Sequence, residues 1–332
     1  MSTTPNSPRT SRPAALFLLS AAWIVLSLAV GRQMSGLAPA LWQDFARSAI
    51  SAAVLFAGFY YFARAWVPDL RPLSSVGFVR RPGIATEFGI GAALGWTIAL
   101  ACVLPSVLTG NLSSSFLWNG TAIFRLILSA ASLVAFALVV QLILAGLPSR
   151  LLVRATGPGW TTAAVIFVAS CLTITRTSGD GSSLLFIALT AALFCTAFLR
   201  TRAIWLPLGL QIGWTLSLQL IFGANSPYEP PSYGIVQSDI GGPAWLTGGP
   251  FGPEASAVAI LVLIAALFVL VRVTRDYAWH YTYQPIEGAG VAVVIAPPAE
   301  HIREEEKAAA KAAPLVQIGG ISLPPTPPDP FL

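Results

Sequence analysis

The chain has 332 residues, of which 55% are hydrophobic and only 10% are charged, and its formal net charge is +5. Soluble domains carry about 25% charged residues, so this composition excludes an ordinary soluble globular protein. It also excludes disorder over most of the length, because disordered chains are polar and rich in charge. The basic residues stand singly or in pairs between apolar segments, a pattern that membrane topology explains better than binding to nucleic acid.

Apolar stretches along the chain predict transmembrane helices. About 20 mostly apolar residues are needed to cross the hydrocarbon core of a bilayer, which is about 30 Å thick. The sequence therefore predicts an all-α polytopic membrane protein with eight helices, although the fifth and sixth stretches are short enough to form one re-entrant pair instead. The predicted spans are 13–31, 46–67, 86–108, 121–146, 160–177, 183–200, 204–223 and 254–272.

The distribution of basic residues predicts the orientation. With the N-terminus inside, the cytoplasmic segments hold fifteen of the 19 Lys and Arg residues. Cytoplasmic loops are enriched in these residues, so both termini are expected in the cytoplasm. The first span follows Arg9 and Arg12, as a signal peptide would, but its apolar run is too long for one. We therefore expect an uncleaved membrane anchor.

The remaining segments differ in composition. Residues 1–12 are predicted to be a cytoplasmic N-terminus, 13–74 two membrane helices, and 75–275 the core of the bundle. Inside that core, the outer connection at about 223–253 is dense in Gly and Pro and has no Lys or Arg. It is long for a connection, so it either caps the bundle, presents a surface to a partner, or is a simple solvated loop. Residues 276–332 are predicted to be a cytoplasmic, largely disordered Pro/Ala-rich tail.

Polar side chains within the spans mark a candidate binding cavity. Gln211, Thr215 and Gln219 recur every four residues and so lie on one face of a helix. Gln141 in the fourth span and Ser170 in the fifth could face them. These side chains either bond helix to helix, which is worth about 1 kcal/mol each, or line a small polar cavity at the centre of the bundle.

Small residues in the third span predict close helix packing. Gly91 and Gly95 form a GxxxG pair, which lets two helices approach closely, either within one chain or between two copies. Packing within the chain is the favoured interpretation. The three cysteines lie in apolar runs without a CxxC pair, so they are expected to be inert packing residues.

Three segments of the core occur in an order that is typical of a known family. They are QLILAGLPSRLLVRATGPGW, TRAIWLPLGLQIGWTLSLQLIFG and LTGGPFGPEAS, with SSVGFVRRP before them. Together they resemble the CPBP family of intramembrane proteins, also called the ABI or CAAX-protease-like family, over about 75–275. The resemblance implies an eight-helix bundle in the bacterial plasma membrane. It also implies kinship with prenyl endopeptidases and bacteriocin-immunity proteins.

Active members of that family are metal-dependent proteases with three motifs. The motifs are a Glu-Glu pair followed by Arg and Gly, a Phe-x-x-x-His, and a His-x-x-x-Asn. In this chain every acid and every histidine of these motifs is replaced. The matching positions are Val140, Gln141 and Ala145 for the first motif, Phe167 and Cys171 for the second, and Gln211 and Thr215 for the third.

The residues at these positions lack the chemistry of the family. Glutamine has the shape of glutamate but does not titrate near pH 7, so it cannot act as the general base. Catalytic zinc usually has three His, Cys or carboxylate ligands, and both histidines of the chain, His280 and His301, follow the last span. We therefore predict no catalytic residue, no metal and no cofactor.

The sequence thus favours a non-catalytic CPBP-like protein. It would act as a scaffold or regulator, or bind a hydrophobic or prenylated peptide, a lipid or another membrane protein, and no nucleic acid. The alternative is an active CAAX-type intramembrane metalloendopeptidase, or a bacteriocin self-immunity protein, that uses a rebuilt site. Metal content separates the two hypotheses, because an active member would hold a stoichiometric divalent ion such as zinc.

Overall fold

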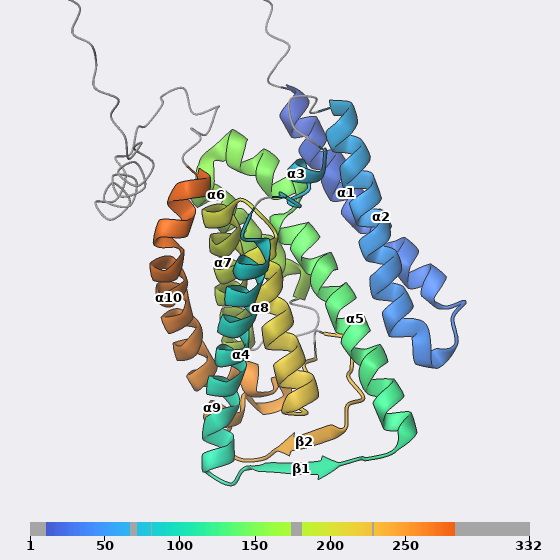
Figure 1. Ribbon diagram of the computed structural model, residues 1–332, viewed down its shortest axis with the longest axis vertical. Helices are drawn as coiled ribbons and strands as arrows, with labels where there is room; N and C mark the ends of the chain where they lie inside the picture. The colour runs from blue at the N-terminus through green and yellow to red at the C-terminus, as the bar shows by residue number, and fades with distance from the viewer. Residues whose placement is uncertain (1–10, 67–71, 81, 174–180, 228, 283–332) are drawn as a thin grey trace, which may run out of the picture. The chain divides into compact units, whose positions relative to one another are not determined.

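A computed structural model describes residues 11–66, 72–80, 82–173, 181–227 and 229–282. In these ranges the chain is mainly long helices, with one small sheet at the end of the bundle opposite α3 (Figure 1). The predicted N-terminal segment up to residue 10 and the predicted tail beyond residue 282 lie outside the described residues.

Each predicted span overlaps a helix in the described residues, and the helix Trp205–Leu216 is shorter than the 18 residues of a candidate span. Six stretches of the described residues are long and apolar enough to cross a membrane, and one of them, Gly120–Cys171, contains two helices. The long helices are α1 (Ser11–Ser35), α2 (Gln43–Trp66), α4 (Ile84–Leu108), α5 (Gly120–Ala145), α6 (Leu147–Thr173), α7 (Gly181–Thr201), α8 (Trp205–Leu216) and α10 (Ala257–Thr282). The short elements are η1 (Ala40–Trp42), α3 (Pro72–Ser75), η2 (Ser217–Ile221), α9 (Ala244–Thr247), η3 (Gly249–Phe251) and η4 (Pro253–Ala255).

The helix that carries the fifth predicted span begins earlier than the sequence indicated. Helix α6 begins at Leu147, although the predicted span begins at 160. Gly157 has a φ of 84°, a conformation that side-chain-bearing residues rarely adopt, and Pro158 follows it. These two residues divide α6 into two helical pieces, and only the second was expected from the apolar pattern.

Helices α4 and α8 approach each other through facing glycines. A Cβ atom on Gly95 would lie 2.0 Å from the carbonyl oxygen of Leu210, and one on Gly91 would also meet the backbone of α8. From the other side, Gly209 and Gly213 meet the backbone of α4 in the same way. The predicted packing of the Gly91–Gly95 pair within the chain is confirmed, and the facing glycine pair on α8 is an addition to it.

A two-stranded antiparallel sheet was not predicted. Strand β1 (Leu112–Phe116) pairs with β2 (Val236–Ile240), so that Leu112 lies opposite Ile240. The serines of β1 add side-chain bonds across the pair, such as the one of 2.8 Å between the hydroxyls of Ser114 and Ser238. Such strands depend on a partner more than 100 residues away, so local propensity gives little signal for them.

The 223–253 connection folds onto the bundle. Its buried apolar residues include Ala224, Leu246 and Phe251, and its buried polar residues include Ser226 and Glu229. Phe251 also packs edge-on against Phe186 of α7. The connection therefore caps this end of the bundle and is not a simple solvated loop.

Large apolar side chains also cover the outside of the long helices. Leu18 and Val25 of α1 and Leu261 and Phe268 of α10 are each more than 60% exposed. A soluble protein rarely exposes so much contiguous apolar surface, whereas a bilayer solvates it. The outer faces and the long apolar helices together have the character of an integral membrane protein.

Candidate functional site

Two buried glutamines connect α5 to α8. The Nε2 atom of Gln141 donates a hydrogen bond of 2.7 Å to Oε1 of Gln211. Only 0% and 4% of these side chains are exposed, and 70 residues separate them in the sequence. The two residues that stand at the first and third motifs in the sequence resemblance are therefore in direct contact.

The polar face of α8 continues into a buried carboxyl group from the connection. Thr215 donates from its hydroxyl to Oε1 of Glu229 at 3.0 Å, and Gln219 donates from Nε2 to Oε2 at 2.5 Å. Gln219 belongs to η2, which is a π-helical turn at the end of α8. Such turns are rare and occur often at functional sites, because they re-aim side chains that an α-helix would place elsewhere.

A second carboxyl group, whose charge acts on the first, is held by the preceding residue of α8. Trp214 donates from Nε1 to Oε1 of Glu254 at 2.9 Å, and the hydroxyl of Ser226 donates to Oε2 at 2.6 Å. Trp214 and Thr215 are neighbours on α8, so one turn of this helix holds both carboxyl groups. We call this set of side chains the polar seam. It consists of Gln141, Gln211, Thr215, Gln219, Glu229 and Glu254.

Burial dominates the electrostatics of Glu229. This residue belongs to the connection outside the spanning helices, and only 8% of it is exposed. Burial first, and then the nearby charge of Glu254, raises the pKa of Glu229 to about 8, and the bonds from Gln219 and Thr215 offset only part of that rise. In the absence of another counter-charge, this carboxyl group therefore holds its proton at neutral pH.

The other predicted site residues lie elsewhere. Phe167 is 69% exposed on α6 and Cys171 is also exposed, so the structure does not bring the second motif to the glutamine pair. Ser170 lies beside them on α6 and is half-buried. Ala145 is buried and Val140 half-buried near the end of α5. Of the five residues predicted to line a cavity, Gln141, Gln211, Thr215 and Gln219 belong to the seam, and Ser170 lies on α6.

Sequence reasoning missed the two carboxyl groups of the seam. It gave no role to Glu229 or Glu254. A signal was present, because both acids stand in a stretch with no basic residue nearby. Only the folding of the connection onto α8 brings them to Thr215 and Gln219.

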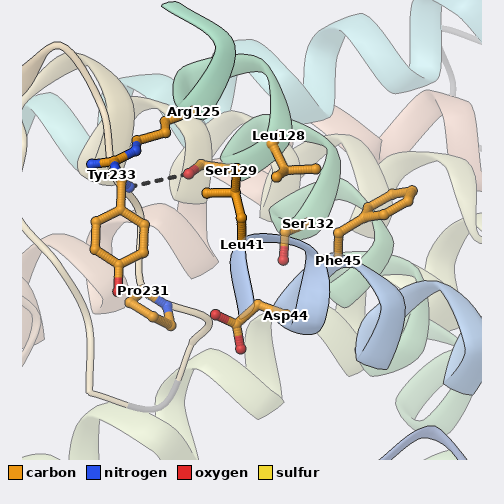
Figure 2. Close-up of a pocket in the computed structure, with 9 residues that line it drawn as sticks. All are labelled: Leu41, Asp44, Phe45, Arg125, Leu128, Ser129, Ser132, Pro231 and Tyr233. Carbon is orange, nitrogen blue, oxygen red and sulfur yellow. Dashed lines mark hydrogen bonds between the residues drawn. The ribbon is translucent and has the colours of Figure 1, made fainter. Parts of the chain in front are cut away.

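In the part of the chain that the structure describes, candidate metal ligands do not cluster in threes and two crevices are small. Within the described ranges, no three side chains of His, Cys, Asp or Glu gather into a metal-binding group. Two small crevices near the start of α5 are lined in part by Arg125 and Tyr233 and have water-accessible volumes of about 20 and 60 Å³. Figure 2 shows the first, where the backbone N–H of Tyr233 donates to Ser129 at 3.1 Å. One water needs about 10–15 Å³, so these crevices suit water rather than a substrate.

The glutamine pair makes a testable contribution to stability. Replacing either Gln141 or Gln211 with leucine leaves the other amide unsatisfied, which costs about 1–3 kcal/mol. The double variant removes both polar groups. We therefore expect its loss of unfolding free energy to be smaller than the summed losses of the two single variants, by a coupling energy of about 1 kcal/mol. Unfolding of the wild type, the two single variants and the double variant in mixed detergent micelles measures this coupling energy. Strictly additive losses would show that the two amides do not interact.

Comparisons with protein-family models, with curated proteins and with solved structures gave no match. The function of this chain is therefore inferred from the residues of the seam and from the motif positions they occupy.

Proposed function

We propose that this chain is a non-catalytic membrane protein of the CPBP type, which acts as a scaffold or regulator in the bacterial plasma membrane. The observation that carries the proposal is the bond between Gln141 and Gln211. These positions correspond to a catalytic glutamate and a histidine in the resemblance, and their contact supports the alignment of the first and third motifs. Both are neutral amides, which neither titrate near pH 7 nor supply the usual ligands of zinc.

We further propose eight spans with both termini in the cytoplasm. Figure 1 supports this topology, because successive long helices alternate in direction, with α3 at one end and the β1–β2 sheet at the other. At the α3 end, Arg150 donates to the backbone carbonyl of Arg202, and Arg154 lies close enough to influence the charge of Arg202. A cluster of arginines at one end agrees with the enrichment of basic residues on the cytoplasmic side.

A partner on the outside of the bundle is favoured over a ligand enclosed within it. The polar side chains within the bundle are bonded to one another in the seam, and the two crevices are too small for a prenyl chain. The exposed apolar faces of helices such as α10 remain available to another membrane protein, or to a hydrophobic or prenylated peptide. The proposed scaffold therefore acts by contact between membrane helices.

Metal content tests the loss of catalysis. Elemental analysis of the detergent-purified protein is expected to find less than about a tenth of an equivalent of zinc, because a catalytic site needs about three ligands that the seam does not have. The Cys171→Ala variant should give the same value, since Cys171 is exposed away from the seam. The protein should also leave a prenylated CAAX peptide uncleaved.

The alternative is an active CAAX-type protease, or an immunity protein, with a rebuilt site. The observation that favours it is the pair of buried carboxyl groups, because a glutamate with a raised pKa is suited to general-base chemistry. Near one equivalent of zinc, lost in the Glu229→Gln variant together with peptide cleavage, would establish this alternative and end the scaffold proposal.

A further inference from the structure

Two buried oxygen acceptors of the polar seam have no donor. Oε1 of Gln219 and Oε1 of Gln141 are both buried and have no hydrogen-bond partner. Glu229 has no Lys or Arg partner within the part of the chain that the structure describes. A buried acceptor without a donor costs about 1–3 kcal/mol, and a buried carboxylate without a counter-charge costs more. The seam therefore has the chemistry of a site for a cation.

Each oxygen of the two carboxyl groups in the seam accepts a hydrogen bond from a neutral donor. Both oxygens of Glu229 accept bonds, from Thr215 and Gln219, and both oxygens of Glu254 accept bonds from other neutral donors. A protonated carboxyl group would also have an O–H to donate. Neutral donors on every carboxylate oxygen orient the pair without neutralising it.

We propose that the seam binds one calcium ion through the carboxylates of Glu229 and Glu254, with the amide oxygen of Gln219 as a further ligand. All three ligand atoms are oxygens, which hard cations prefer. A divalent ion balances the charge of two carboxylates. Calcium tolerates irregular geometry and takes additional water or carbonyl ligands, whereas magnesium demands near-octahedral geometry and zinc prefers nitrogen or sulfur.

Such an ion would fasten three separate segments to one another. Glu229 comes from the connection after η2, Gln219 from the π-helical turn of η2, and Glu254 from η4 before α10. Glu229 is 8% exposed and lies in the connection outside the long helices. Calcium therefore acts as a clamp on the cap of the bundle, a role that is independent of whether the protein is catalytic.

Thermal unfolding of the full chain in detergent tests the clamp. After treatment with EGTA, adding 5 mM calcium at pH 7.5 is expected to raise Tm by roughly 3–6 °C, which corresponds to a Kd on the order of 10⁻⁴ M. Isothermal titration calorimetry should give one site, and magnesium should produce a smaller shift. The Glu229→Gln and Glu254→Gln variants should lose the shift. The Gln219→Glu variant should bind calcium roughly tenfold more tightly, because it adds a third carboxylate.

The control is the Glu87→Gln variant, which changes another buried glutamate, in the first turn of α4 and not among the proposed calcium ligands. It should keep the full response to calcium, even if its Tm is lower. No shift in the wild-type protein, or a shift that survives in both Glu229→Gln and Glu254→Gln, would overturn the proposal. A Tm that depends on pH but not on calcium would also overturn it, because a shared proton would then neutralise the pair. The zinc content tests the proposed loss of catalysis and the calcium response tests the clamp, so the failure of one proposal does not decide the other.

Discussion

Replacing Gly95 with leucine is expected to remove most of the folded protein. A Cβ atom at this position would lie 2.0 Å from the carbonyl oxygen of Leu210 and 2.6 Å from the backbone nitrogen of Trp214. Backbone atoms cannot rotate away as a side chain can, so α4 and α8 would have to separate. Overpacking of a core costs about 1–3 kcal/mol even when side chains can adjust, and we expect a larger loss here. Size-exclusion chromatography of detergent extracts measures the surviving fraction.

Gly89 provides a matched control on the same helix. A Cβ atom at Gly89 would have no neighbour within 4 Å, so Gly89→Leu should extract and elute like the wild-type protein. Gly213→Leu should behave like Gly95→Leu, because it faces the backbone of Ala92 at 2.2 Å. A monodisperse Gly95→Leu protein with an unchanged Tm would contradict the close approach of α4 and α8.

Stability without calcium is expected to decrease as the pH rises through about 8. The pKa of Glu229 is about 8 in the folded chain and 4.5 when the carboxyl group is solvated, so the folded state binds more protons between these values. The stabilising contribution is complete below about pH 4.5 and is lost as the pH rises through 8, with a slope of at most about 1.4 kcal/mol per pH unit. The titratable groups that share this environment are Glu254, whose charge acts on Glu229, and Cys102, on which the charge of Glu254 also acts.

Measurements of Tm from pH 5 to pH 9.5 in EGTA test this expectation. The Glu229→Gln variant should have a flatter profile, because an amide mimics the protonated carboxyl group and does not titrate. The Asp44→Asn variant is the control, since Asp44 pairs with Arg47 at 3.7 Å in a partly exposed ion pair and has no bond to a residue of the seam among those that the structure describes. Such surface pairs contribute little, so this variant should keep the wild-type profile. Identical profiles for Glu229→Gln and the wild-type protein would disprove the role of Glu229.

The two expectations concern one structural unit. Helix α8 contacts α4 through its glycines, and from the same segment it holds both carboxyl groups with Trp214 and Thr215. A change that separates α8 from α4 should therefore also weaken calcium binding. Glu229→Gln, in contrast, should remove the calcium response and leave the contact between the two helices intact.

The positions of the helices could be predicted from the sequence because they depend on local composition. A long apolar run in a membrane must satisfy its own backbone hydrogen bonds, and the α-helix does so within one segment. The spacing of Gln211, Thr215 and Gln219 likewise fixes one polar face, whatever the helix contacts. For the same reason, the GxxxG spacing of Gly91 and Gly95 indicated a close helix contact before the partner was known.

The remaining features depend on contacts between distant segments. Glu229 enters the seam only because an irregular connection folds onto α8, and no periodic pattern encodes such a path. The β1–β2 sheet joins strands from opposite ends of the core, and the exposed position of Cys171 depends on which face of α6 its neighbours cover. Composition determined that this chain forms apolar helices, because burial in lipid acts on each segment separately. Tertiary structure alone decided that two acids meet on α8, because their environment is made by residues far away in the chain.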